Sequence, residues 1–246
     1  MNYEDLIKIK PKYVYYVLGL RRSGNHLFIS WIISNYTKVL FFNDINFNFF
    51  QNNLSDFWCY KEKNQFNEKI NQNLLSVSDN WDNIDCLIIS LEDKTCNKFT
   101  ETINSLNFAT AKKIYKIIVI RDLLNCITSR LIKHIKNDNA RHIVPINDYI
   151  MKLWLSHYHD ILCIHFNYNK FIISPEYRTL IQKELNLVNI SEEVLYSISN
   201  FFNGSSFEND FNFLDRYKNY LDNYHINKIL NNKTIMDILE SEFNID

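Results

Sequence analysis

The sequence predicts an α/β fold, a three-layer structure in which a parallel β-sheet of about five strands is flanked by helices. Two observations lead to this prediction. Several apolar runs show no regular polar alternation, which is typical of strands that are buried on both faces. Segments with helical apolar periodicity separate these runs, as a parallel sheet requires. The length of 246 residues fits one domain covering 1–246.

The expected strands are short runs rich in β-branched and aromatic residues. The clearest is the continuous run Ile117-Ile118-Val119-Ile120. The strands are predicted at residues 13–20, 39–43, 86–91, 113–120 and 163–166. Ligands bind at the carboxyl ends of the strands in such sheets. The residues that follow the strands are therefore expected to form a site: Gly19 to Gly24, Asp44, Glu92 and Arg121.

The first expected helix follows Gly24 and carries apolar residues such as Leu27 and Trp31 at helical spacing. Ser174 and Pro175 have the types preferred at the N-cap and the first helical position. A polar region covers residues 46–83, and a helix is expected within it at about 62–75. Further helices are predicted at 98–110, 123–136, 148–162, 174–186 and from 191, with a loop at 203–206 and helical structure after it.

Composition and charge exclude several classes. The net charge of −1 provides no basic field for nucleic acid. The five cysteines are scattered without a C-x-x-C pair, so neither a disulfide framework nor a metal site is expected. Residues 1–12 lack the apolar core of a signal peptide, and no apolar run is long enough to span a bilayer. These features predict a cytoplasmic protein.

The turn between the first strand and helix, Gly19-Leu20-Arg21-Arg22-Ser23-Gly24, has the build of an anion-binding cradle. Backbone N–H groups at a helix start point toward such an anion, and the helix dipole favours negative charge there. The two glycines have the spacing of the P-loop G-x-x-x-x-G-K-[ST], but Asn25-His26 replace its lysine and hydroxyl residue. A metal-chelated triphosphate is therefore not the expected anion. The alternative is an ordinary turn with two solvated arginines.

A second informative stretch runs from 117 to 130, where a strand ends at Arg121 and Ser129 follows eight residues later. Two helical turns would place Ser129 near the same face as Arg121. An arginine and a hydroxyl so arranged can both bind one phosphate. The alternative is an Arg121–Asp122 surface pair with an unrelated helix serine.

Together the two stretches resemble the sulfotransferases that use 3′-phosphoadenosine 5′-phosphosulfate (PAPS). That family has a 5′-phosphosulfate loop with a basic residue followed by Ser-Gly-Thr, and a 3′-phosphate motif with an arginine and a serine eight residues on. The matching residues here are Arg22-Ser23-Gly24-Asn25-His26, with Arg21 before them as a further expected nucleotide contact, and the pair Arg121 and Ser129. Residues 165–187 look similar to an uncharacterised branch of the superfamily, in which 204–207 would close over the nucleotide. The resemblance implies a P-loop-like sulfotransferase architecture.

The resemblance also implies a reaction: transfer of a sulfuryl group from PAPS to a hydroxyl or amine, without a metal, leaving adenosine 3′,5′-bisphosphate. Arg22 would stabilise charge on the bridging oxygen. Asp44 is the first candidate for the base, Glu92 the second, and His26 is a phosphate contact. Two departures from the family are Arg22 in place of its lysine and Asn25 in place of its hydroxyl residue.

The acceptor has no motif of its own and could be a glycan, a phenol or a peptide. The region 46–83 and the helices after 137 are expected to shape its pocket. His157 and His159 lack metal-ligand spacing and are interpreted as structural. Two other functions stay open: a P-loop nucleotide or small-molecule kinase, and a catalytically inactive nucleotide-binding protein.

Overall fold

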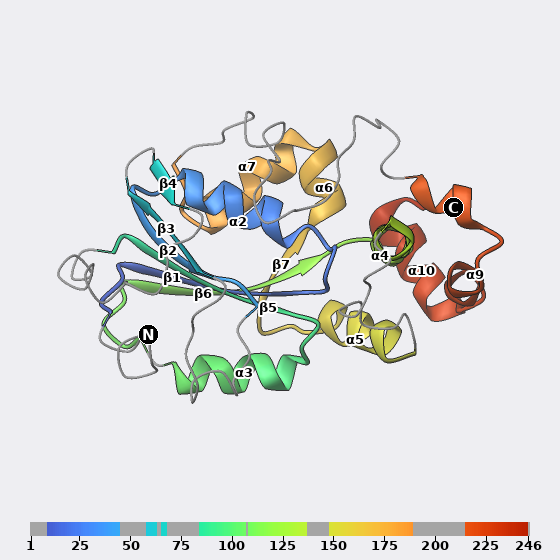
Figure 1. Cartoon of the computed structure of the whole chain (residues 1–246), viewed down its shortest axis with the longest axis horizontal. Helices are drawn as coiled ribbons and strands as arrows, with labels where there is room; N and C mark the ends of the chain where they lie inside the picture. Colours follow the sequence, from blue (N-terminus) through green and yellow to red (C-terminus); the bar gives the residue numbers. More distant parts are fainter. Residues whose placement is uncertain are drawn as a thin grey trace.

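The computed structural model describes residues 9–44, 58–62, 65–67, 84–106, 108–136, 148–188 and 215–245. These residues form an α/β fold in which helices cover both faces of a β-sheet (Figure 1). The predicted five-stranded parallel sheet is confirmed. Its strands stand in the order β2 (Lys38–Phe42), β5 (Cys86–Glu92), β1 (Tyr13–Gly19), β6 (Lys113–Ile120) and β7 (Ile164–Asn167).

Two further strands extend the sheet beyond β2. They are β3 (Trp58–Glu62), antiparallel to β2, and β4 (Gln65–Asn67), antiparallel to β3. The predicted helix at 62–75 is therefore wrong over 62 and 65–67, and residues 68–75 lie outside the described part of the chain. The run Trp58-Cys59-Tyr60 has high β-propensity, and β2 offers it an unpaired edge, so pairing overrides the helical pattern.

The two faces of the sheet carry separate apolar layers because successive side chains of a strand point to opposite sides. Along β1, Tyr16 and Leu18 pack in one layer and Tyr15 and Val17 in the other. The first layer is covered by α3 (Cys96–Ser105) and α5 (Asp148–Tyr158), and the second by α2 (Asn25–Ser34), α6 (Tyr168–Ile173) and α7 (Pro175–Glu184) (Figure 1).

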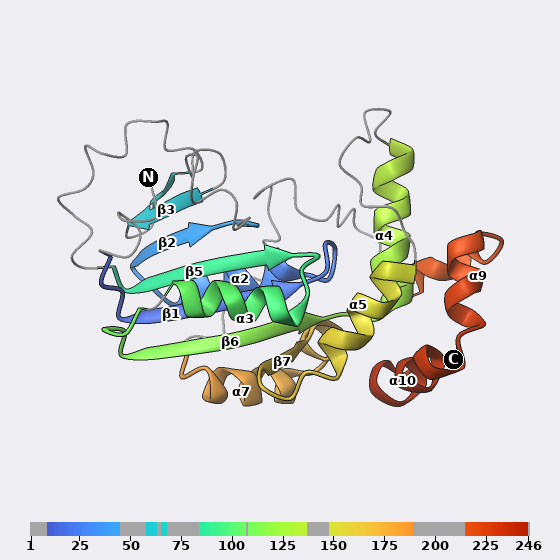
Figure 2. The same cartoon turned by 90° about the horizontal axis from the view of Figure 1, so that it is seen from below.

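A helical group lies beyond the carboxyl ends of the strands (Figure 2). It consists of α4 (Leu123–Lys136), η4 (Arg216–Tyr220), α9 (Tyr224–Leu230) and α10 (Lys233–Phe243). Both η4 and α9 pack against α4, which starts directly after β6. This arrangement brings the C-terminal residues to the edge of the sheet where the sequence predicts the site.

Most predicted helices are confirmed with shifted ends. The bounds of α4 agree with the prediction, whereas α3 and α5 end earlier than predicted. Ser174 caps α7, since its side chain accepts a hydrogen bond from Tyr177 N–H at 3.1 Å, and Pro175 follows it. The short α6 is not anticipated as a separate helix. The helix expected from 191 and the loop at 203–206 lie outside the described residues.

None of the helices in the described ranges combines the length and apolarity needed to cross a bilayer.

The strand register shows how the sheet positions the site. Gly19, the last residue of β1, is aligned with Glu92 on β5 and with Val119 on β6. The turn after Gly19, the carboxylate of Glu92 and the side chain of Arg121 therefore emerge at the same edge.

Candidate functional site

The turn between β1 and α2 has an unusual backbone. Arg22 and Gly24 both adopt positive φ angles, 74° and 96°, and Ser23 N–H donates to Leu20 O at 3.0 Å. Gly19 is needed because a Cβ there would lie 2.2 Å from Asn25 Oδ1. The turn therefore closes tightly over Gly19, and its two positive-φ residues direct the chain into α2.

Ser23 and Asn25 are buried and hold this turn from inside. The hydroxyl of Ser23 donates to Asn25 Oδ1 at 2.9 Å. The Asn25 amide donates to Leu20 O at 3.3 Å and to Glu92 Oε1 at 3.1 Å. The side chains of Ser23 and Asn25 are engaged in these hydrogen bonds, so an anion outside the turn would meet backbone N–H groups rather than the Asn25 amide.

Helix α2 begins without a side-chain cap. Gly24 is its N-cap, and no side chain accepts from the first-turn amides as a cap. Phe28 N–H donates to Gly24 O at 3.2 Å, and the amides before Phe28 have no acceptor within the helix. Such a terminus favours an anion through its N–H groups and its dipole.

Two arginines lie beside this helix start. Arg22 is half-buried and makes no ion pair with any described residue. Burial lowers the pKa of its guanidinium, the nearby Arg130 and Arg121 lower it further, and Glu92 opposes them. Arg121 is only 3 % exposed, and its Nη1 donates to Arg22 O at 3.2 Å. Arg121 therefore lies close to Arg22, and Arg22 has no carboxylate within ion-pair distance among the described residues.

Arg21 differs from these two because it is paired. Its Nη2 lies 2.6 Å from Asp44 Oδ2, and its Nε lies 3.4 Å from Glu92 Oε2. The other oxygen of Asp44, Oδ1, accepts from Glu92 N–H at 3.0 Å. Arg21 thus joins the ends of β2 and β5, and both carboxylate oxygens of Asp44 are engaged by that junction.

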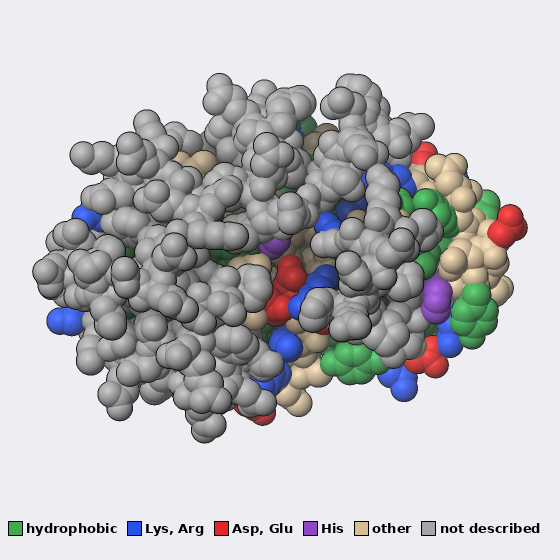
Figure 3. Space-filling model, viewed as in Figure 1, with side chains coloured by type: hydrophobic (Ala, Val, Ile, Leu, Met, Phe, Trp, Pro, Cys, Tyr) green, Lys and Arg blue, Asp and Glu red, His purple; other side chains and the backbone are tan. Residues whose placement is uncertain are grey.

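Glu92 faces the start of α2. Besides the Asn25 amide, His26 Nε2 lies 4.0 Å from Glu92 Oε1. Acidic, basic and histidine side chains lie together near the middle of the face shown in Figure 3. The structure therefore brings together Arg21, Asp44, Glu92, His26 and the turn, as the strand ends predicted.

A buried ion pair holds the turn in place. It was not predicted from the sequence. Arg130 Nη2 lies 2.5 Å from Asp93 Oδ1, and the two side chains are 3 % and 7 % exposed. Asp93 Oδ1 also accepts from Arg21 N–H at 3.0 Å, while Arg130 Nε donates to Arg21 O at 3.1 Å. Both polar groups of the Arg21 backbone are thereby fixed. The two residues adjoin Glu92 and Ser129 in sequence, but no local pattern indicates that they pair.

Arg121 and Asp122 are not a surface pair, contrary to the alternative considered for them. Both are buried, and Arg121 Nε lies 3.9 Å from Asp122 Oδ2. Asp122 is instead bound by Asn169, whose Nδ2 donates to Oδ2 at 2.8 Å, and by the Asn125 N–H at 2.7 Å. Burial raises the pKa of Asp122, and Arg121 and these hydrogen bonds oppose the rise. This network fixes the backbone just after Arg121.

Ser129 lies half-buried in the second turn of α4, as predicted. Within the described residues, no hydrogen bond joins it to Arg121. That Ser129 and Arg121 bind one phosphate together stays a prediction. Residues 204–207, expected to close over the nucleotide, lie outside the described part of the chain. His157 is buried and its Nε2 contacts Lys94 O at 2.7 Å, which confirms its structural interpretation.

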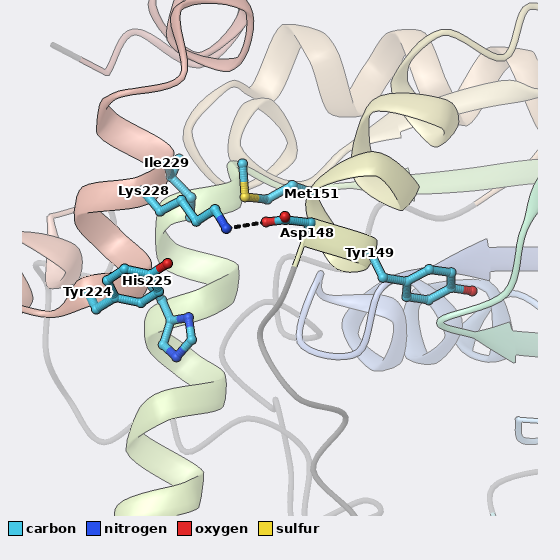
Figure 4. Close-up of a pocket in the computed structure, with 7 residues that line it drawn as sticks. All are labelled: Asp148, Tyr149, Met151, Tyr224, His225, Lys228 and Ile229. Atoms are coloured by element: carbon cyan, nitrogen blue, oxygen red, sulfur yellow. Dashed lines mark ion pairs between the residues drawn. The ribbon is translucent and has the colours of Figure 1, made fainter.

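A separate cavity of about 330 Å³ lies between α5 and α9. In Figure 4, Lys228 and Asp148 point toward one another as an ion pair, with Met151 beside them. Tyr149, Tyr224, His225 and Ile229 complete its described lining. None of the predicted site residues lines it, although its helices are among those after 137 that were expected to shape an acceptor pocket.

In comparisons with known proteins, no family model and no curated protein sequence matches the chain. The features that bear on function are therefore the turn after β1, the start of α2 and the residues around Arg121.

Proposed function

We propose that this protein is a PAPS-dependent sulfotransferase, which moves a sulfuryl group from PAPS to a hydroxyl or amine of an acceptor. The observation that carries the proposal is the pair of arginines beside the uncapped start of α2. Arg22 has no ion-pair partner among the described residues, and Arg121 contacts the Arg22 carbonyl at 3.2 Å. Two adjacent cations and a helix N-terminus suit a nucleotide that carries anionic groups at two positions.

The residues divide between the two ends of this donor. The N–H groups at the start of α2, with Arg22 and His26, would bind the 5′-phosphosulfate. Arg121 and Ser129 would bind the 3′-phosphate, where a guanidinium can bind bidentately. Ser23, Gly24, Asn25 and Arg21 would act through the shape of the turn, because their side chains or backbone groups are engaged within it.

The proposed chemistry is one in-line substitution. The acceptor oxygen or nitrogen forms a bond to sulfur, the bond from sulfur to the bridging oxygen breaks, and adenosine 3′,5′-bisphosphate leaves. Arg22 would stabilise the negative charge that develops on the bridging oxygen. A base takes the acceptor proton.

Glu92 is now the favoured base over Asp44. The closest contact of Arg21 is to Asp44, at 2.6 Å, whereas its Nε lies 3.4 Å from Glu92. Both oxygens of Asp44 are engaged at the strand ends, since Oδ2 contacts Arg21 and Oδ1 accepts from Glu92 N–H at 3.0 Å. Glu92 also faces the start of α2 through its contact with the Asn25 amide.

A metal-dependent kinase is less well supported. The position of the P-loop lysine is held by Asn25, whose side chain is buried within the turn. His26 takes the position of the hydroxyl residue that would bind Mg²⁺.

Isothermal calorimetry with adenosine 3′,5′-bisphosphate and with ATP, each with Mg²⁺ and with EDTA, tests the proposal. We expect tighter binding of the bisphosphate and no effect of EDTA. Tighter, Mg²⁺-dependent binding of ATP would support the kinase instead. Transfer is then assayed with radiolabelled PAPS and a panel of glycans, phenols and peptides. Tight bisphosphate binding without transfer to any of them would support the inactive nucleotide-binding protein.

A further inference from the structure

Tyr168, the first residue of α6, lies directly against the turn that follows β1. It is 1 % exposed, and a Cβ added to Gly24 would lie 2.0 Å from its Cδ2. Gly24 is therefore required twice, by its φ of 96° and by the ring packed against it. The ring of Tyr168 covers the residue from which α2 starts.

The same ring contacts Arg121. The guanidinium carbon of Arg121 lies 4.9 Å from the ring centroid, within the range of a cation–π interaction. Tyr168 thus touches both parts of the proposed binding site, the N-cap of α2 and the cation at the end of β6.

The hydroxyl of Tyr168 is buried and has no hydrogen-bond partner among the residues that the structure describes. Arg121 Nε is also buried and has no hydrogen-bond partner among the described residues. Tyr177 makes a useful comparison, since its hydroxyl accepts from Asn167 N–H at 2.7 Å and donates to His165 O at 3.2 Å. Buried donors without acceptors are unfavourable, and a ligand that supplies an acceptor removes that cost.

Charge around the hydroxyl favours an anionic acceptor. Burial raises the pKa of Tyr168 to about 12, while Arg121 and then Arg216 oppose the rise and Asp122 adds to it. The hydroxyl is therefore protonated at neutral pH and can donate. Two arginines lie near enough to bias its surroundings toward an oxyanion.

We propose that Tyr168 is a binding residue whose hydroxyl donates to the same phosphate group that Arg121 binds. The ligand class is a phosphomonoester, bound by two donors that form no hydrogen bond with any described residue, although Arg121 Nε also lies 3.9 Å from Asp122 Oδ2. Identifying this group as the 3′-phosphate of adenosine 3′,5′-bisphosphate rests on the proposed function. The contact between a phosphate and Tyr168 does not depend on that identification.

The test compares Tyr168→Phe with Tyr177→Phe, which serves as a matched control. Calorimetry measures adenosine 3′,5′-bisphosphate, adenosine 5′-monophosphate, ATP and inorganic phosphate on each protein, and thermal unfolding is measured without ligand. We expect Tyr168→Phe to weaken the bisphosphate by about tenfold. The 5′-monophosphate, which lacks the second phosphate, should change by less than about twofold, within ordinary context effects.

The stability readout separates binding from a structural role. Because the Tyr168 hydroxyl has no partner in the described residues, its removal should leave Tm unchanged or raise it. Tyr177→Phe should lower Tm and leave the affinity ratio of the two nucleotides unchanged. A loss of Tm in Tyr168→Phe equal to that in Tyr177→Phe would overturn the inference.

The outcomes also separate this inference from the proposed function. Equal bisphosphate affinity of wild type and Tyr168→Phe overturns the inference and leaves the function standing. If the wild type binds ATP or inorganic phosphate in preference to the bisphosphate, and Tyr168→Phe weakens that ligand about tenfold, the inference holds and the function fails. A wild-type protein that binds none of the four ligands overturns both.

Discussion

Arg121 donates a hydrogen bond from Nη1 to the carbonyl oxygen of Arg22, at 3.2 Å. Arg121 follows β6 and Arg22 follows β1, and these strands are neighbours in the sheet. The bond therefore ties the turn before α2, in which Arg22 has a φ of 74°, to the next strand end. It places the two cations of the proposed nucleotide site in one connected unit.

Arg121→Ala should weaken adenosine 3′,5′-bisphosphate by about ten- to hundredfold, because a hydrogen bond to a charged group contributes about 1.5–3 kcal/mol. Adenosine 5′-phosphosulfate lacks the 3′-phosphate and should lose much less. Calorimetry with both ligands checks this. Arg121→Lys keeps the charge without the planar fork, so its affinity for the bisphosphate should lie between those of the wild type and Arg121→Ala. Equal losses for both ligands would indicate that Arg121 acts only by holding the turn.

Arg22→Ala should lower turnover by about 10²–10³, as expected for a group that stabilises transition-state charge. Affinity for the bisphosphate should fall far less. Arg22→Gly is the control for the backbone, since glycine adopts the positive φ of this position without steric cost. The glycine variant should have the higher Tm and an equally low turnover. A turnover loss that merely matches the loss of binding would argue against the proposed role.

Glu92→Gln should lower turnover by about 10²–10⁴ with nucleotide affinity preserved, as the loss of a general base predicts. Asp44→Asn should instead reduce the free energy of unfolding by about 1–3 kcal/mol, because it weakens the partly buried pair with Arg21. Steady-state transfer assays and urea unfolding of both variants check this. The reverse pattern would make Asp44 the base. If transfer survives both substitutions, His26 becomes the next residue to test.

Arg130→Met should reduce the free energy of unfolding by about 3–5 kcal/mol, since it leaves the buried carboxylate of Asp93 without its closest partner. The double variant Arg130→Met with Asp93→Asn should recover part of that loss. Urea unfolding of the wild type, both single variants and the double variant measures the coupling. Additive losses would show that the two side chains do not stabilise the turn as a pair.

The pH dependence of stability should contain a contribution from His157. Burial lowers its folded-state pKa below the ordinary value of 6.5, although Lys94 O, Asp93 and Asp160 oppose this effect and His165 adds to it. The unfolded chain therefore takes up a proton below about pH 6.5 that the folded protein does not, and stability falls as pH decreases through that range. Urea unfolding at pH 7.5 and 5.5 should show a smaller decrease for His157→Gln than for the wild type. Parallel decreases would exclude this contribution.

Local patterns in the sequence were sufficient for much of the fold. The apolar runs located all five parallel strands, because strands buried on both faces need continuous apolar residues. The cap at Ser174 and the full extent of α4 were also predictable. The strand at 58–62 was not, because its conformation depends on the edge of β2 and not on its own neighbours.

Local sequence patterns are enough to show which residues reach the edge of the sheet, because the turn at Gly19–Gly24, Asp44, Glu92 and Arg121 each stand at or just after the end of a strand. The pairing of their side chains follows from the folded structure alone: Arg21 binds Asp44, Arg22 has no such partner among the described residues, and Tyr168 packs on Gly24. The two kinds of interaction differ in their range along the chain. Strand and helix formation depends on neighbours along the chain, whereas a charge or a ring takes the partner that folding brings within a few ångströms.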